Sequence, residues 1–252
     1  MSSHSQFYRG LSMVVAIAVG CTLGARPSSA EDRTFCVTVK TFLGTSADAS
    51  AEHRIIFDNG LIYDLPQLDP ATVTVYDPAQ GRVTMLDRPR QVQSSIRIDD
   101  LIEFTSKARA AATTDEQRAQ LGLNSKVKTS DRMIGYMIQF SGATYHTSTQ
   151  KPADPKMASE FGQFFDLASR LNLVRNTWLP PFARMTLNDR LTSSGEIPLE
   201  TTLTIKRGEQ TNEYRTTTTI DGLADRDRTA IDEVRGMMTL YKEVAAGDFP
   251  DA

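Results

Sequence analysis

The chain has 252 residues, of which 40% are hydrophobic and 23% charged, and its formal net charge is −3. Its two cysteines are too few for a scaffold held together by several disulfides. A mildly acidic chain without a basic run is also a poor nucleic-acid binder, so nucleic acid is not an expected partner.

The first thirty residues predict an export signal that is cleaved. A short polar region carrying only Arg9 precedes the apolar run 11–23, which is too short to span a bilayer core comfortably. Small residues follow and end at Ala30, where we expect cleavage. The mature chain 31–252 then keeps 26 basic and 31 acidic residues, a net charge of about −5. We expect one domain, periplasmic or secreted, without a transmembrane span.

A second processing route competes with this one. Ala18-Val19-Gly20-Cys21 resembles a bacterial lipobox, in which Cys21 would be lipidated and anchor the protein to a membrane. Ala18 stands where a larger aliphatic residue is usual, so this route ranks second. After cleavage at Ala30 only Cys36 remains, and its strand-like surroundings favour a small buried apolar residue over a nucleophile.

Six strands are expected before residue 99, at 33–43, 53–58, 61–65, 72–77, 82–87 and 91–98. A loop of small residues, 44–51, separates the first two. Asn59-Gly60 tolerates positive φ at both central positions and predicts a two-residue hairpin turn. Pro78-Ala79-Gln80-Gly81 predicts a second hairpin. Connections this short require antiparallel neighbours, because parallel strands need long crossovers.

The hydrophobic spacing then becomes helical. Asp100-x-x-Glu103 predicts a capping box for a helix to about residue 112, and Thr114-x-x-Gln117 predicts a second that ends near 122. Further helices are expected at 154–174, at 182–193 and after Asp225, which is expected to cap the last one. The remaining strands are expected at 132–140, 143–149, 199–205 and 211–220. The order of elements predicts an α+β fold: a curved antiparallel sheet, an incomplete barrel, with helices covering its concave face.

The helix 154–174 begins with the clearest signal, an N-cap acid followed by proline at the first helical position. Its apolar side chains form a stripe at helical spacing. The stripe is either a core face packed on the sheet or the lining of a cavity for an acyl chain, since methionines and aromatic rings suit irregular apolar ligands. The candidate ligand-binding residues are Met157, Phe161, Phe164, Phe165 and Leu171.

No pattern in the chain predicts catalysis, a cofactor or a metal. His53 and His146 each stand alone on a strand, without a second ligand at metal spacing. Ser148-x-x-Lys151 matches the motif of penicillin-recognising enzymes, but Ser148 ends a strand instead of opening a helix. The acidic residues after position 220 lack calcium-loop spacing and suit the start of a helix; they are Asp221, Asp225, Asp227 and Asp232.

Three segments resemble the lipoprotein-carrier superfamily of the bacterial envelope: 58–63 (DNGLIY), 75–84 (VYDPAQGRVT) and 197–205 (IPLETTLTI). The resemblance implies an incomplete antiparallel barrel, closed by helices, that shelters acyl chains. The chain departs from that family in leading from Glu31 almost directly into a strand, where the carriers have a long amphipathic helix. Residues 154–195 have no counterpart there, and no arginine matches the family's gating arginine.

The sequence favours a non-enzymatic exported protein that binds an apolar or lipid ligand, or a lipid-modified protein partner. The alternative is a structural or interaction module of the cell envelope with a solid core. A hydrolase ranks third, because no nucleophile is paired with a base.

Overall fold

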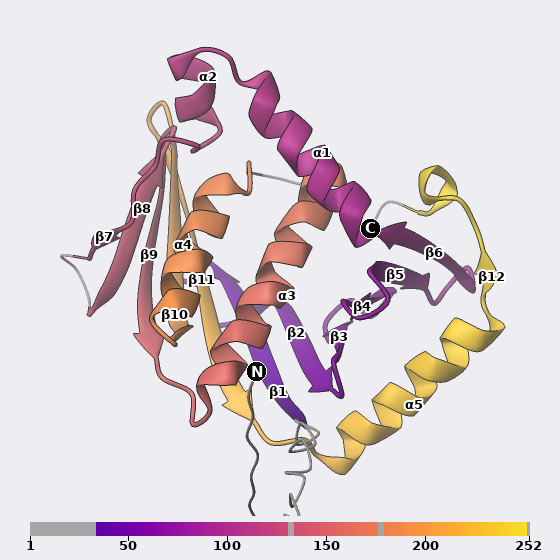
Figure 1. The fold of residues 1–252 in the computed structure, drawn as a ribbon. Coiled ribbons are helices and arrows are strands. Elements are labelled where there is room, and N and C mark those ends of the chain that lie inside the picture. Colours follow the sequence, from indigo (N-terminus) through magenta and orange to yellow (C-terminus); the bar gives the residue numbers. More distant parts are fainter. Residues whose placement is uncertain (1–33, 131–133, 176–178, 251–252) are drawn as a thin grey trace, which may run out of the picture. The chain divides into compact units, whose positions relative to one another are not determined.

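The computed structural model describes residues 34–130, 134–175 and 179–250 (Figure 1). Within these residues twelve strands form one sheet in the order β12-β6-β5-β4-β3-β2-β1-β11-β10-β9-β8-β7. The pairing of β12 with β6 is parallel and the others are antiparallel, and the two end strands do not pair, so the sheet is mixed and not closed. The predicted α+β class and the mostly antiparallel sheet are confirmed. The predicted export segment 1–30, including Cys21, lies outside the described residues.

The strands have these bounds: β1 (Thr34–Leu43), β2 (Ala49–Asp58), β3 (Leu61–Pro66), β4 (Thr72–Asp77), β5 (Arg82–Asp87), β6 (Val92–Arg97), β7 (Lys128–Thr129), β8 (Gly135–Phe140), β9 (Ala143–Gln150), β10 (Ile197–Arg207), β11 (Gln210–Asp221) and β12 (Lys242–Glu243). The helices are α1 (Ile98–Ala111), α2 (Asp115–Gln120), α3 (Pro155–Val174), α4 (Phe182–Ser193) and α5 (Asp225–Leu240), and Ala246–Asp248 forms a short 3-10 turn.

Both predicted hairpin turns are present. Asn59 and Gly60 have φ values of 52° and 82° and connect β2 to β3 through a two-residue turn. In the second turn the Gly81 N–H donates to the Pro78 carbonyl at 3.3 Å, and Gly81 has a φ of 65°. Positive φ is costly for side chains with a Cβ, which explains why glycine stands at these positions.

The predicted loop 44–51 is too long. β2 begins at Ala49, which pairs with Phe42 after a register shift between Thr41 and Phe42. The residues at the start of β2 are small and polar, so they give no alternation of buried and exposed side chains from which a strand could be predicted. The two-residue strand β7 is missed for a similar reason, since it is too short to have a period.

The helix caps follow the sequence in two of four cases. The prediction that Asp225 caps the last helix is wrong, because Ala224 is the N-cap residue and Asp225 is the first residue of α5. The Thr114 hydroxyl accepts from the Gln117 N–H at 3.2 Å, and the Gln117 side chain accepts in return from Thr114 N–H, also at 3.2 Å. Asp154 accepts from the Lys156 N–H at 2.9 Å, with proline at the first helical position.

The predicted capping box of Asp100 and Glu103 is wrong. α1 begins three residues earlier, at Ile98, and its N-cap residue Arg97 makes no side-chain capping bond. Glu103 instead pairs with Lys107 one turn later, at 2.6 Å. Asp100 lies in the first turn, where its charge complements the helix dipole.

Strands β1 to β5 contribute buried side chains to both faces of the sheet. Val37, Ile55 and Phe57 lie in one core cluster with α3, while their neighbours Cys36 and Ile56 lie in a second cluster. That second cluster also contains α5 residues Ile231 and Val234. Helices α3 and α5 therefore pack on opposite faces of the sheet, whereas the sequence placed the helices on one face.

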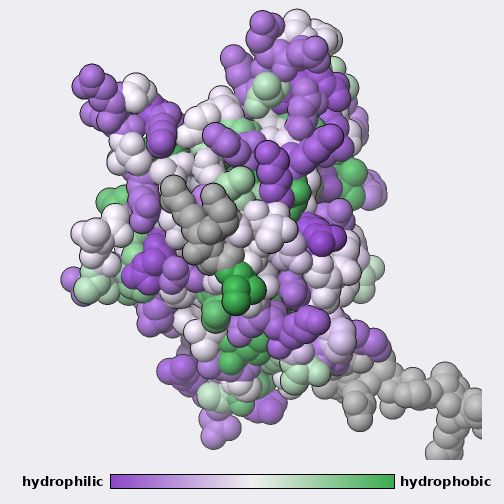
Figure 2. Space-filling model, turned by 90° about the vertical axis from the view of Figure 1, so that its left-hand side faces the viewer, coloured by the Kyte–Doolittle hydropathy of each residue, from purple (hydrophilic) through white to green (hydrophobic). Residues whose placement is uncertain are grey.

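The other half of the sheet is covered on one face only. α4 packs on β8 and β10 through Ala183 and Leu187, which lie with Ile138 and Leu203 in a third core cluster. Along β10 buried side chains alternate with half-buried ones, the pattern of an antiparallel strand with one solvated face. Viewed from the side on which β7 and β8 lie, the surface is mostly polar around a small apolar patch (Figure 2).

A buried ion pair joins β2 to α5. The guanidinium of Arg54 donates to both carboxylate oxygens of Asp227, at 2.5 and 2.7 Å, and to Asp221 at 3.3 Å. Arg54 also donates to the hydroxyl of Thr38 at 3.0 Å. The start of α5 is thus held against the sheet by charge-assisted hydrogen bonds as well as by apolar packing.

Candidate ligand-binding site

Two neighbouring cavities lie between the sheet and α3. The larger has a volume of about 750 Å³ and the smaller about 350 Å³. Both are lined by His53, Asp64, Ala168 and Asn172, so β2, β3 and α3 form a wall that the two cavities share. Both volumes lie within the range of small-molecule sites, which is about 300–1,000 Å³.

The smaller cavity has mainly apolar and aromatic walls. α3 contributes Phe164 and Phe165, whose rings lie edge to face with centroids 5.4 Å apart. The facing strands contribute apolar side chains, namely Val39, Ile55, Tyr145, Leu203 and Tyr214. These strands are β1, β2, β9, β10 and β11, so the cavity depends on the pairing of β1 with β11.

One permanent cation lines this apolar cavity. The guanidinium carbon of Arg184, on α4, lies 5.0 Å from the centroid of the Phe165 ring and 5.7 Å from that of Tyr145. Burial lowers the pKa of Arg184, and Tyr145 partly opposes that shift. An arginine nevertheless stays charged in proteins. In the described ranges of the chain no carboxylate lies within 4.0 Å of this guanidinium.

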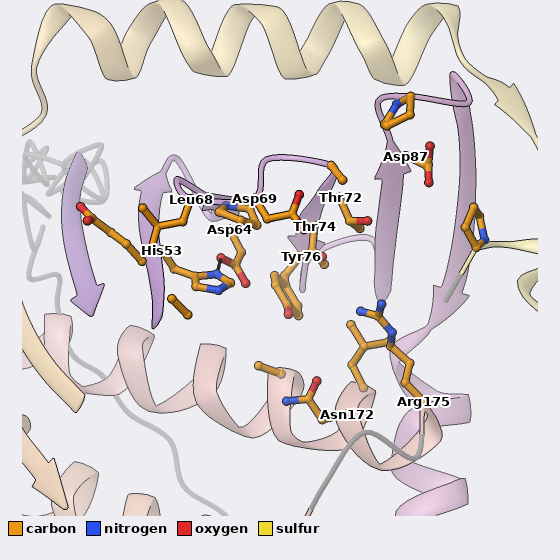
Figure 3. Close-up of a pocket in the computed structure, with 18 of the residues that line it drawn as sticks. His53, Asp64, Leu68, Asp69, Thr72, Thr74, Tyr76, Asp87, Asn172 and Arg175 are labelled. Atoms are coloured by element: carbon orange, nitrogen blue, oxygen red, sulfur yellow. Dashed lines mark hydrogen bonds and ion pairs between the residues drawn. The ribbon is translucent and has the colours of Figure 1, made fainter. Parts of the chain in front are cut away.

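The shared wall carries a histidine–carboxylate pair. Nδ1 of His53 and Oδ1 of Asp64 lie 2.6 Å apart, and Figure 3 shows the two side chains turned toward each other. Burial lowers the pKa of His53, but the hydrogen bond and the charge of Asp64 outweigh it, so the net shift is upward from 6.5. The imidazolium form is therefore favoured in the folded protein.

The larger cavity is more polar. Across it from His53 and Asp64, α3 contributes Asn172 and Arg175 (Figure 3). Its other ionisable walls are Glu52, Asp69, Asp87 and Arg90. Tyr76 is 2% exposed at its edge, and burial raises the pKa of that phenol well above 10. The smaller, mainly apolar cavity and the larger, more polar cavity thus lie on either side of the hydrogen-bonded pair of His53 and Asp64.

The five candidate residues of α3 are divided between these surroundings. Phe164 and Phe165 line the smaller cavity, and Leu171 lines the larger. Phe161 is 3% exposed and belongs to the packed core, against which Met157 also lies. Beside Phe161 is a space of only about 10 Å³, no more than one water molecule needs. The ligand-binding role of these residues stays a prediction.

The other residues considered from the sequence lie elsewhere. His146 is 5% exposed, with Nδ1 3.2 Å from the Ser130 hydroxyl. Ser148 lies against the Glu200 carbonyl at 3.5 Å. Cys36 is fully buried as expected, and burial raises the pKa of its thiol to about 11. Among the residues that the structure describes, no three histidine, cysteine, aspartate or glutamate side chains are grouped closely enough to hold a metal.

Sequence reasoning missed the pairing of His53 with Asp64, although a signal for it was present. The hairpin at Asn59-Gly60 fixes the register of β2 and β3, so His53 stands opposite Pro66 and diagonal to Asp64. Diagonal neighbours on one face of a sheet are within reach of long side chains. Arg184 has no comparable signal, because its place in the cavity depends on how α4 packs over distant strands.

No protein-family model matches the chain, and no curated protein matches its sequence.

Proposed function

We propose that this protein is a non-enzymatic, exported protein of the cell envelope, periplasmic or secreted, that binds an apolar or lipid ligand in the smaller cavity. The observation that carries the proposal is the aromatic lining: Phe164, Phe165 and Tyr145 surround about 350 Å³ of space. Small-molecule sites are mostly apolar and aromatic, with a few polar groups that fix orientation. The export signal predicted over 1–30 supports the location.

The arrangement of the helices supports the same function. Helices α3 and α4 lie over the sheet on the side of the two cavities, and we propose that this side is the concave face of an incomplete barrel. A face closed only by helices leaves room for a ligand between layers, whereas a fully interdigitated sheet and helix would not. An acylated protein could present its chain to the same cavity. In the described residues no helix is long and apolar enough to cross a membrane.

One observation favours the alternative, a structural or interaction module with a solid core. Phe161 and Phe164 pack against Phe57, with ring centroids 6.5 and 6.3 Å from it, in the largest core cluster. In that alternative the smaller cavity would hold only water, and apolar compounds would not bind with measurable affinity.

Filling the cavity tests the proposal. Ser169 lines the smaller cavity from α3, so Ser169→Phe places a ring in the space that the ligand needs. Ser159, exposed on the same helix and lining neither cavity, provides the matched control Ser159→Phe. N-phenyl-1-naphthylamine, a neutral probe that fluoresces in apolar sites, should bind the wild type and Ser159→Phe equally and Ser169→Phe at least about tenfold more weakly.

If the wild-type protein causes no increase in the fluorescence of the probe, the result would contradict the lipid-binding function and favour the structural module with a solid core. Native mass spectrometry of protein from its own host provides an independent measurement. A co-purifying lipid supports the proposal, and a clean mass of the protein alone opposes it.

A further inference from the structure

Arg184 is unlike the other residues of the smaller cavity. Its guanidinium lies between two aromatic rings, those of Phe165 and Tyr145, on a wall that is otherwise largely apolar. Arg184 is half-buried, and partial removal of a cation from bulk water is unfavourable unless an anion or several hydrogen-bond acceptors compensate. Attraction to the ring faces compensates only in part. The described residues place no carboxylate beside this cation, so the cavity has an unneutralised positive charge.

The other arginines that lie over rings in the described part of the chain are in a different situation. Arg109, on α1, lies 5.4 Å from the Phe182 ring and lines neither cavity. Arg215 lies 4.3 Å from the Phe42 ring and also pairs with Glu200 at 3.6 Å. Arg190, two turns along α4 from Arg184, lies 5.2 Å from the Tyr136 ring but is exposed and lines neither cavity. Arg184 alone among these four combines ring contacts, a cavity wall and the lack of a carboxylate partner.

Among the residues that the structure describes, Asp64 is the one carboxylate on the wall of the smaller cavity, and it is already engaged. It lies 2.6 Å from Nδ1 of His53. An anion that enters the cavity therefore meets the guanidinium of Arg184, which no described carboxylate contacts.

We propose that Arg184 binds the anionic group of a single-chain amphiphile whose apolar chain occupies the smaller cavity. The inference rests on the proposed function and specifies the ligand. The planar guanidinium matches both carboxylate and phosphate oxygens in a two-pronged arrangement, so the shared chemistry is an acyl or alkyl chain that ends in one of these anions. The volume of about 350 Å³ lies at the lower end for ligand sites and suits one chain better than two.

Displacement of N-phenyl-1-naphthylamine by three twelve-carbon competitors tests the inference. Dodecanoate and dodecyl phosphate carry the anion, and dodecanol has the same chain without it. At pH 7 we expect at least one of the two anions to displace the probe from wild-type protein at a concentration about tenfold or more below that of dodecanol. The anion that binds more tightly distinguishes a carboxylate ligand from a phosphate ligand.

Variants locate the effect at Arg184. Arg184→Met keeps an unbranched apolar side chain in the wall and should remove the preference for the anion while the neutral probe still binds. Arg190→Met removes a ring-stacked arginine of the same helix outside the cavity and should keep the wild-type preference. Arg184→Gln serves as a second variant, and the thermal midpoint of each variant shows that it is folded.

The outcomes separate the two proposals. Probe binding with equal displacement by anion and alcohol in the wild type overturns the inference about Arg184 and leaves the apolar site intact. An anion preference that persists in both Arg184 variants also overturns it. Failure of the wild type to bind the probe or any competitor overturns the proposed function itself.

Discussion

At the scale of single residues, two opposing effects determine the pKa of His53. Burial disfavours the imidazolium, whereas the 2.6 Å contact with Asp64 favours it, and the second effect prevails. The folded-state pKa of His53 therefore lies above 6.5, the value of an unperturbed histidine. The contribution of the pair to the stability of the fold is fully present below the unfolded-state pKa of His53. It is lost as the pH rises through the folded-state pKa.

His53→Gln should therefore destabilise the protein more at pH 5.5 than at pH 8.5. The measurement is the free energy of unfolding in urea at both pH values for wild type and variant. Asp64→Asn is the matched variant and should remove the same pH-dependent difference, because it removes the other member of the pair. The remaining charged groups around the cavities are the same in both variants; they are Glu52, Asp69, Asp87, Arg90, Arg175 and Arg184. An equal cost of His53→Gln at the two pH values would contradict this assignment.

At the scale of elements, local signals in the sequence were sufficient where a turn or cap determines the geometry. The predicted two-residue turn, the capping box of Thr114 and the N-cap of Asp154 are all present. Signals failed where a strand is polar or very short, as in β7. They also failed at α1, where the capping pattern of Asp100 and Glu103 lies inside a helix that starts without a side-chain cap.

The turn between β2 and β3 provides a direct test. Gly60 has a φ of 82°, which a β-branched residue adopts only with strain, so Gly60→Val should lower the free energy of unfolding by about 1 kcal/mol or more. Gly60→Asn is the control, since asparagine tolerates positive φ, and it should cost less. Urea denaturation midpoints compare the two. A valine variant as stable as the asparagine variant would show that the turn has another geometry.

At the scale of the whole molecule, the sequence predicted the class of the fold but not the order of the strands in the sheet. The pairing of β1 with β11 joins residues such as Val37 and Ile220 that are far apart in the chain. No turn fixes this register, and strand propensity alone cannot select a distant partner. The smaller cavity depends on this pairing, because β1 and β11 contribute to the same wall. The aromatic residues of the site were therefore predictable from helical spacing, and its strand residues and Arg184 were not.

The position of α5 was equally hidden in the sequence. Asp227 was interpreted as one of several acids that suit a helix start, and it does accept from the Ala224 N–H at 2.7 Å. It is also 2% exposed and bound by Arg54 of β2, an interaction across 173 positions. The hydrogen bond from Arg54 is the main cause that lowers the pKa of Asp227. This pair connects the face opposite the cavities to the centre of the sheet.

Breaking the pair should destabilise the whole fold. Asp227→Ala leaves Arg54 buried without its principal partner, and removing one member of a buried ion pair costs roughly 3–5 kcal/mol. Asp225→Ala, exposed in the same first turn, should cost no more than about 1 kcal/mol, the size of a helix-dipole contribution. Urea denaturation of both variants provides the comparison.

Replacing both partners separates the charge from the packing. In Arg54→Leu/Asp227→Leu no uncompensated charge remains, and apolar residues often replace buried ion pairs at little cost. The double variant should therefore be more stable than Asp227→Ala, even though it lacks every hydrogen bond of the pair. If its stability were lower still, the hydrogen bonds of Arg54 to Asp221 of β11 and Thr38 of β1 would stabilise these strands independently of Asp227.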